Sequence, residues 1–229
     1  MGVSDKIVNN IFPTDNAWQS DQKYDKNIFN VPDYTELQGH FQTEKYILHN
    51  NEEVLRWFKF KVDHSNSQKF LEEDICVTHF RGGDYKNISK WILPTDYYTH
   101  AQNYVKSINP NVKFIVVTDD MHEAMARFDC PVYSSELALD FYMLCHAKYL
   151  IMSNSSFSWW GAYLNKRSNV FIAPKYWLLH KDNSGIWFPA DAITSKFTYI
   201  DINGKAHSSD DCIKEFNPVT NYTNKCWSF

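Results

Sequence analysis

Short apolar segments alternate with amphipathic segments through the middle of this 229-residue chain. Between residues 74 and 175, five apolar runs of five to seven residues are separated by stretches whose apolar side chains recur at helical spacing. A short buried run is typical of a strand, and apolar residues three and four positions apart are typical of an amphipathic helix. The predicted strands are 74–80, 113–119, 130–134, 148–154 and 169–175, and the predicted helices are 94–108 (starting near Thr95), 120–128, 136–147 and 156–165.

This alternation predicts an α/β fold with a doubly wound parallel sheet of the Rossmann type. Parallel strands need crossover connections, whose helices cover both faces of the sheet. Such sheets bind ligands at the carboxyl ends of their strands. The pattern fades after 176–180, so we predict a lead-in at 1–73 with a helix capped by Asn51, the α/β domain at 74–200, and a polar tail at 201–229 without regular elements.

Composition narrows the classes of function. An apolar content of 44% is enough for a sizeable core, and a net charge of -4 with a pI near 6.1 provides no field for nucleic acid or an anionic membrane. Any phosphate site must therefore be local. The aromatic fraction of 17% suits sugar stacking, and an aromatic core accounts for it equally well, so both interpretations remain, with the core favoured.

The cysteines and the apolar segments bear on the cellular compartment. Five cysteines without Cys-x-x-Cys spacing indicate neither a zinc knuckle nor a complete disulfide framework, so we expect reduced thiols. The N-terminus has no apolar core of a signal peptide, and no segment is as long and apolar as a membrane span. These features predict a soluble, cytoplasmic protein.

The segment HFRGGDY (79–85) lies where the first predicted strand ends. Gly82 and Gly83 would allow a tight turn with positive φ, which leaves Arg81 free to project its guanidinium. A planar guanidinium holds two phosphate oxygens at once, which an ammonium cannot do. The alternative is that Arg81 is only an ion-pair partner.

A second polar cluster, NSSFSWW (154–160), lies between a predicted strand and a predicted helix. The free N–H groups and positive dipole end of a helix N-terminus favour an anion. The alternative is that Ser156 merely caps the helix while Trp159 and Trp160 fill the core. An esterase is disfavoured because the nucleophile elbow Gly-x-Ser-x-Gly is absent.

Carboxylates near the other strand ends have two possible roles. Asp140 lies near the start of a predicted helix, where it would interact with the helix dipole or accept the paired N1–H and N2–H donors of guanine. Asp119 and Asp120 follow another predicted strand. We expect these two aspartates to cap the next helix, because no Asp-x-Asp motif or histidine cluster indicates a metal site.

These stretches resemble the alpha-1,2-fucosyltransferases and, more distantly, the alpha-1,6- and protein O-fucosyltransferases. HFRGGDY is similar to the family's HxRRGDY, NSSFSWWGAYLN (154–165) to its NSSFSWWGAWLN, and IAPKYW (172–177) to the strand and loop that follow. LQGHFQTEKYI (37–47) resembles a segment that precedes the donor domain. The resemblance extends from about Tyr34 to Ala190 and implies a GT-B-like fold with a GDP-sugar domain.

The resemblance also implies residue roles. His79 and Asp140 match positions that contact guanine, Arg81 matches the arginine on the β-phosphate, and Ser155 and Ser156 match residues that contact phosphate. The family inverts the anomeric centre and needs no metal or other cofactor. The predicted donor site comprises His79, Arg81, Asp140, Asn154, Ser155, Ser156 and Phe157, and the predicted catalytic residues are Arg81 and Asp84.

Two departures from the family pattern shape the functional prediction. Gly82 stands where the family has a second arginine, and the family's glycine-rich GGLGNQMFQY segment has no counterpart, so we expect a truncated acceptor side in 1–73. That leaves Asp84 and Glu44 as weak candidates for the general base.

We predict an enzyme that transfers L-fucose from GDP-fucose to a glycan hydroxyl in an alpha-1,2 linkage. The alternatives are a non-catalytic protein that binds GDP or a GDP-sugar, and a protein O-fucosyltransferase. The expected partners are GDP-fucose and the glycan acceptor. A second copy of the chain, or a separate chain that supplies the acceptor side, is a further possible partner.

Overall fold

A seven-stranded sheet forms the centre of the structure, a computed structural model that describes residues 24, 26–30, 32, 43–60, 74–178, 180 and 192–216. The strand order is β3-β2-β1-β4-β5-β6-β7, and every neighbouring pair is parallel except β6 and β7. This order confirms the predicted Rossmann-type α/β fold. The strands are Ile75–Phe80 (β1), Lys113–Thr118 (β2), Val132–Tyr133 (β3), Tyr149–Ile151 (β4), Val170–Pro174 (β5), Thr198–Ile200 (β6) and Ala206–His207 (β7).

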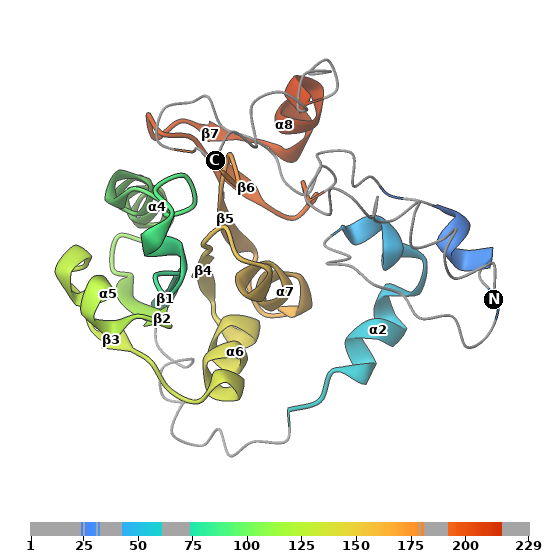
Figure 1. Cartoon of the computed structure of the whole chain (residues 1–229), viewed down its shortest axis with the longest axis horizontal. Coiled ribbons are helices and arrows are strands. Elements are labelled where there is room, and N and C mark those ends of the chain that lie inside the picture. Colours follow the sequence, from blue (N-terminus) through green and yellow to red (C-terminus); the bar gives the residue numbers. More distant parts are fainter. Residues whose placement is uncertain are drawn as a thin grey trace.

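Helices cover both faces of this sheet (Figure 1). α4 and α5 lie on one face, α6 and α7 lie on the other, and α8 lies beside β6 and β7. The helices are Asn51–Trp57 (α2), Thr95–Ile108 (α4), Met121–Arg127 (α5), Leu137–His146 (α6), Ser156–Leu164 (α7) and Ser209–Phe216 (α8), with short 3-10 helices at Lys26–Asn30 (η1), Glu44–Tyr46 (η2), Leu48–Asn50 (η3) and Tyr85–Asn87 (η4).

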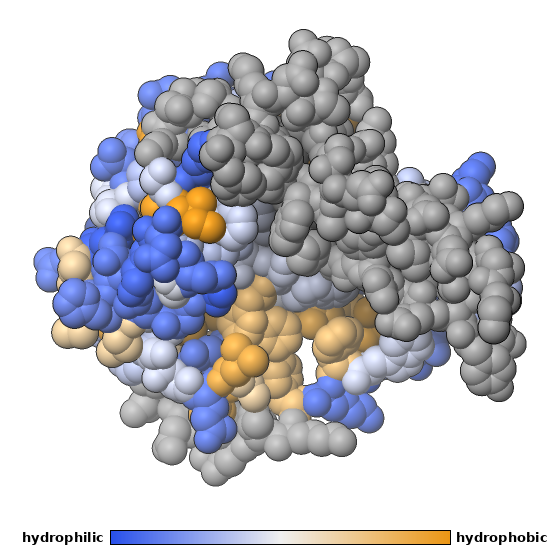
Figure 2. All heavy atoms as spheres, viewed as in Figure 1, coloured by the Kyte–Doolittle hydropathy of each residue, from blue (hydrophilic) through white to orange (hydrophobic). Residues whose placement is uncertain are grey.

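Alternate side chains of each strand enter two separate parts of the core. Val77 and Leu150 pack with α6 and α7, whereas their neighbours Cys76 and Ile151 pack with α4 and α5, as the two-residue period of a strand requires. Trp159 and several tyrosines are among the largest fully buried side chains, which supports the core interpretation of the aromatic content. Hydrophobic residues gather over α6 and α7 in Figure 2, while the region of α4 and α5 is mostly hydrophilic.

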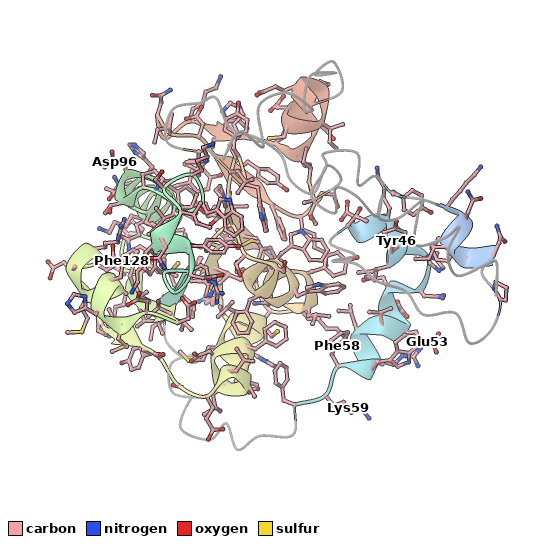
Figure 3. The ribbon with its side chains drawn as sticks, viewed as in Figure 1. Tyr46, Glu53, Phe58, Lys59, Asp96 and Phe128 are labelled. Carbon is pink, nitrogen blue, oxygen red and sulfur yellow. The ribbon has the colours of Figure 1, made fainter. Side chains whose placement is uncertain are left out.

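The part of the chain before β1 contacts the outer side of α7. Phe58 follows α2 and stacks on Trp160 of α7, with ring centroids 6.3 Å apart (Figure 3). The N-cap of α2 is Asn50 and has no side-chain capping bond, so the prediction that Asn51 caps this helix is wrong by one residue. Asn51 is instead the first helical residue.

The expectation that residues 201–229 lack regular elements is wrong for the described part of that segment. β7 pairs with β6, and Cys212 of α8 is completely buried in the core that contains α6 and α7. β6 was also missed, because three residues give too short a pattern. The sheet therefore continues through residue 207.

Two further expectations concern cysteines and membrane spans. Cys76, Cys130, Cys145 and Cys212 are free thiols. Within the described ranges, no helix combines the length and apolar character needed to cross a membrane.

Candidate functional site

The crossover direction of the sheet reverses between β1 and β4. From β1 the chain proceeds outward through β2 and β3, whereas β4, β5 and β6 extend in the opposite direction. Loops that leave a sheet at such a point diverge and open a crevice at the carboxyl ends of the two strands. HFRGGDY continues from β1 and NSSFSWW follows β4, so the two predicted motifs flank this switch point.

Arg81 is held by two carboxylates just beyond β1. Phe80 is in register with Thr118 of β2, so the next residues along each chain, Arg81 and Asp119, lie side by side. Arg81 Nη1 is 2.5 Å from Asp119 Oδ2, and its Nη2 is 2.7 Å from Asp84 Oδ1. About a third of the Arg81 side chain is exposed, so these pairs orient the guanidinium more than they stabilise the fold.

The two glycines of the motif have a different purpose from the one expected. Among the described glycines only Gly204 has a positive φ, so the prediction of a positive-φ turn at Gly82 and Gly83 is wrong. A Cβ at Gly82 would lie 2.7 Å from Asp120 Cβ, and one at Gly83 would overlap Asp119 Oδ2. The close approach of these aspartates is what requires glycine, and the Gly82 N–H donates to Asp119 Oδ1 at 2.9 Å.

His79 is a buried histidine on the face of the sheet that carries α6 and α7. It follows Val77 with the period of a strand, and its ring centroid lies 5.4 Å from that of Phe157 in α7. Only 4% of His79 is exposed, and its Nδ1 has no hydrogen-bond partner in the described structure. Burial, together with the nearby charge of Arg81, lowers the pKa of His79 to about 3. The ring is therefore neutral at pH 7 and has an unpartnered nitrogen.

Asp140 lies in the first turn of α6, on the same face of the sheet as His79. Its carboxylate accepts from the Ser135 N–H at 3.1 and 3.3 Å. Burial raises the pKa of Asp140 to about 6. The next residue, Phe141, lies 5.1 Å from Phe157 between ring centroids, so aromatic rings connect the surroundings of Asp140 and His79.

The first turn of α7 is capped by Ser155 and not by Ser156. Ser155 has an extended backbone, and its Oγ accepts from the Phe157 N–H at 3.3 Å. Ser156 is the first residue of the helix. Trp159 is 1% exposed and bonds to Thr194 Oγ1 at 3.0 Å, so the core interpretation holds for this residue.

Asn154 precedes this helix and makes contacts inside the protein. Its Nδ2 donates to the carbonyl oxygens of Trp91 and Trp177, both at 2.7 Å. The predicted donor residues thus divide into two groups around the switch point. His79, Asp140 and Phe157 lie on the face of α6 and α7, whereas Arg81, Asn154 and Ser155 lie in the loops after β1 and β4, and Ser156 begins α7.

The two candidate bases lie near opposite ends of the parallel strands. Asp84 belongs to the loop after β1, and 62% of its side chain is exposed. Glu44 accepts from the Ser195 N–H and hydroxyl, both at 3.1 Å, and Ser195 precedes β6. Because β6 is parallel to β1, the start of β6 lies at the amino ends of the strands, whereas the motifs lie at the carboxyl ends. This geometry leaves Asp84 as the better-placed carboxylate.

The adjacent aspartates after β2 have separate roles. Asp120 caps α5 by accepting from the Glu123 N–H at 3.1 Å, as expected. Asp119 does not cap the helix and holds Arg81, a role that the parallel register of β1 and β2 could have suggested. Over the described ranges, no group of three or more His, Cys, Asp or Glu residues is arranged to hold a metal ion. Metal independence stays a prediction.

Comparison with known proteins identifies the family to which the chain belongs. The Escherichia coli O-antigen biosynthesis glycosyltransferase WbnK is 30% identical over 171 residues, which are 65% of this chain and 57% of that protein. An Escherichia coli alpha-1,2-colitosyltransferase is 31% identical over 162 residues, 62% of this chain and 56% of that protein. The chain therefore spans little more than half the length of these curated relatives. Residues 8–194 match the model of Glycosyl transferase family 11, and the chain belongs to this family.

Proposed function

We propose that this chain binds GDP-fucose and transfers L-fucose to a glycan hydroxyl in an alpha-1,2 linkage, with inversion and without a metal ion. The observation that carries the proposal is the pairing of two buried polar side chains, His79 and Asp140, with the fixed guanidinium of Arg81 beside the β1 and β4 switch point. Family membership supports glycosyl transfer, and the name of one relative supports the linkage. That relative is named for colitose, so the identity of the sugar rests on the motif resemblance.

Guanine suits the polar groups on the face of α6 and α7. Its N1–H and N2–H donors match a carboxylate such as Asp140, which would be ionised in the complex. Its acceptor atoms match an N–H of neutral His79, whose Nδ1 has no partner among the described residues. Adenine and uracil lack the paired donors, so they would leave Asp140 with the Ser135 N–H as its donor and without the pair of bonds from the base.

The diphosphate suits the loops after β1 and β4. Direct displacement forms a bond from the acceptor oxygen to the anomeric carbon while the bond from that carbon to the β-phosphate oxygen breaks. The acceptor proton passes to a base, for which Asp84 is the best-placed carboxylate, and GDP leaves with the additional negative charge. Arg81 and the N–H groups at the start of α7 would stabilise that charge, and a preorganised donor of this kind contributes about a hundred- to thousandfold in rate.

A second candidate function is GDP-sugar binding with little turnover. Gly82 stands where the family motif has a second arginine, and both terminal nitrogens of the Arg81 guanidinium are paired with carboxylates. A phosphate must compete with these carboxylates, which lowers the stabilisation available to the leaving group.

Calorimetry and a transfer assay test the proposal. We expect GDP to bind at least about tenfold more tightly than ADP or UDP, because the latter cannot give the buried Asp140 carboxylate the paired donors that guanine supplies. Fucose transfer from GDP-fucose to a panel of galactose-containing glycans should persist in excess EDTA, and nucleotide-activated colitose serves as the alternative donor. Binding without transfer would support the second candidate. Equal affinity for the three nucleotides, or strict dependence on manganese, would contradict the proposal.

A further inference from the structure

Asn154 connects three loops that surround the proposed donor site. It follows β4, which lies between β1 and β5 in the sheet. Its amide donates to Trp91, in the loop after β1, and to Trp177, in the loop after β5. Its backbone carbonyl accepts from the Tyr85 hydroxyl at 3.3 Å. A single residue therefore joins the loops on both sides of β4.

The bonding capacity of this side chain is used within the protein. Asn154 is 1% exposed, both N–H donors of its amide have carbonyl partners, and its Oδ1 accepts from the Ser153 hydroxyl at 3.1 Å. A direct bond from this amide to a nucleotide sugar would break a buried hydrogen bond and leave a carbonyl unsatisfied. The geometry thus argues against the ligand role predicted for Asn154 from the sequence.

The neighbours of Asn154 explain what these bonds hold in place. Tyr85 bonds to Asn154, and the guanidinium of Arg81 lies over its ring at 5.4 Å from the centroid. On the other side, the next residue in the chain is Ser155, the cap of α7. Asn154 thereby links the position of Arg81 to that of the helix N-terminus.

We propose that Asn154 is a positioning residue that sets the spacing between Arg81 and the first turn of α7. The proposal rests on the proposed function, in which these two elements bind one diphosphate. Preorganised donors are effective only when their geometry is fixed before binding, so loosening the loops should weaken donor binding.

Asn165 provides a matched control at the other end of α7. It is 4% exposed, and its amide also donates to two carbonyls, those of Leu144 at 2.9 Å and Ala147 at 3.0 Å. α7 starts at the carboxyl ends of the strands and runs back across the sheet. Asn165 therefore lies near the amino ends of the strands, and Asn154 lies at their carboxyl ends. The two residues share their chemistry and burial but not their location.

The first experiment compares Asn154→Ala with Asn165→Ala. Both variants should lower the melting temperature, because Asn154→Ala loses three side-chain hydrogen bonds and Asn165→Ala loses four. We expect calorimetry to show a GDP Kd raised about tenfold or more for Asn154→Ala, and within about twofold of the wild type for Asn165→Ala. A wild-type Kd for Asn154→Ala, or an equal loss in both variants, would overturn the proposal.

Asn154→Asp adds a pH readout that general loss of stability would not produce. Facing two carbonyl oxygens in a buried site, the new carboxyl would have a raised pKa. Protonated, it regains one donor; ionised, it repels both carbonyls. The ratio of its GDP Kd to that of the wild type, measured at the same pH, should therefore fall as the pH is lowered from about 8 to about 5. A ratio independent of pH would contradict the positioning role.

Hydrogen exchange separates this proposal from the proposed function. One amide of the loop after β1 is the Trp91 N–H, which bonds to the Ile88 carbonyl at 2.8 Å. Amides of this loop should exchange faster in Asn154→Ala than in the wild type, and at the wild-type rate in Asn165→Ala. If the wild type binds no GDP, the proposed function fails. The exchange rates then decide the positioning role alone: faster exchange confined to Asn154→Ala supports it, and any other result overturns it.

Discussion

Asp140 has an ionisation equilibrium that nucleotide binding should shift. Burial raises its pKa to about 6, whereas hydrogen bonds from guanine would favour its ionised form. GDP binding at about pH 5.5 should therefore release up to one proton, and GDP affinity should fall as the pH drops below about 6. In the unliganded protein the same raised pKa means that ionising Asp140 lowers stability as the pH rises from about 4 to about 6.

Calorimetry in two buffers with different ionisation enthalpies measures this proton release. Asp140→Asn should abolish the release and reduce the preference for GDP over ADP, because the amide keeps the shape of the side chain but cannot ionise. Undiminished proton release and an unaltered nucleotide preference in this variant would exclude Asp140 from guanine recognition.

Replacing Arg81 tests whether this residue takes part in transfer or only forms ion pairs. Arg81→Lys keeps the charge but loses the planar pair of donors, so kcat for transfer should fall about tenfold to a hundredfold with little change in unfolding. Arg127→Lys is the control, since Arg127 pairs with Glu123 of the same helix at 2.6 Å and otherwise contacts Thr95 and the Phe80 ring, none of which is a proposed donor residue. Equal kcat values for Arg81→Lys and the wild type would remove Arg81 from the catalytic group.

Some site residues could be predicted from the sequence because their position follows from a strand end, whereas others depend on strand register or on backbone contacts. Arg81 and His79 could be found because a strand end followed by glycine places polar groups at a sheet edge. The role of Asp119 depends on the register of β1 with β2, which hydrophobic spacing does not determine. Asn154 bonds to backbone carbonyls, and a carbonyl leaves no trace in the residue type that supplies it.

At the scale of elements, the glycines after β1 determine how closely α5 approaches. A Cβ at Gly82 would meet Asp120 Cβ at 2.7 Å and Phe80 Cε1 at 2.9 Å. Gly82→Ala should therefore lower the free energy of unfolding by about 1 to 3 kcal/mol, and it should raise the GDP Kd by displacing Asp119 from Arg81. Denaturant titration and calorimetry measure the two effects.

A glycine in the β6–β7 turn provides the control for this prediction. Gly204 has φ of 81°, and a Cβ there would lie 2.6 Å from His100 Nδ1, so Gly204→Ala should also destabilise the fold. Since this turn is separated from β1 by other strands, the GDP Kd should stay near the wild-type value. A similar rise in Kd for both variants would show that Gly82 has no specific effect on the site.

Elements were predictable where their patterns were long. The main strands and helices between residues 74 and 175 match the expected order, whereas β6, β7 and α8 were missed. α8 nevertheless has a sequence signal. Ser208 accepts from the Asp211 N–H at 3.1 Å while Asp211 accepts from the Ser208 N–H at 3.1 Å, which is the reciprocal pattern of a capping box.

On the scale of the whole molecule, the C-terminal elements close one end of the core. Lys175 follows β5 and is 7% exposed, and its ammonium is 2.8 Å from Glu215 Oε2 of α8. The Tyr176 hydroxyl donates to the other oxygen of Glu215 at 2.5 Å. α8 therefore supplies a carboxylate to a buried cation next to the loop after β5, which Asn154 also contacts.

Removing the Glu215 carboxylate tests this closure. Glu215→Ala leaves the nearly buried Lys175 without its carboxylate, which is costly, although the partial exposure of Glu215 allows water to replace it in part. We expect the free energy of unfolding to fall by about 1 to 2 kcal/mol, whereas Lys214→Ala on the exposed side of the same helix should change it by less than about 0.5 kcal/mol.

Burial raises the pKa of Glu215, but the bonds from Lys175 and Tyr176 outweigh it and lower the pKa overall. The stabilisation is therefore present above the unfolded pKa and is lost on acidification, so denaturant titrations of the two proteins should converge as the pH falls. Equal stability of Glu215→Ala and the wild type at pH 7 would show that the Glu215 carboxylate does not stabilise the contact between α8 and the residues after β5.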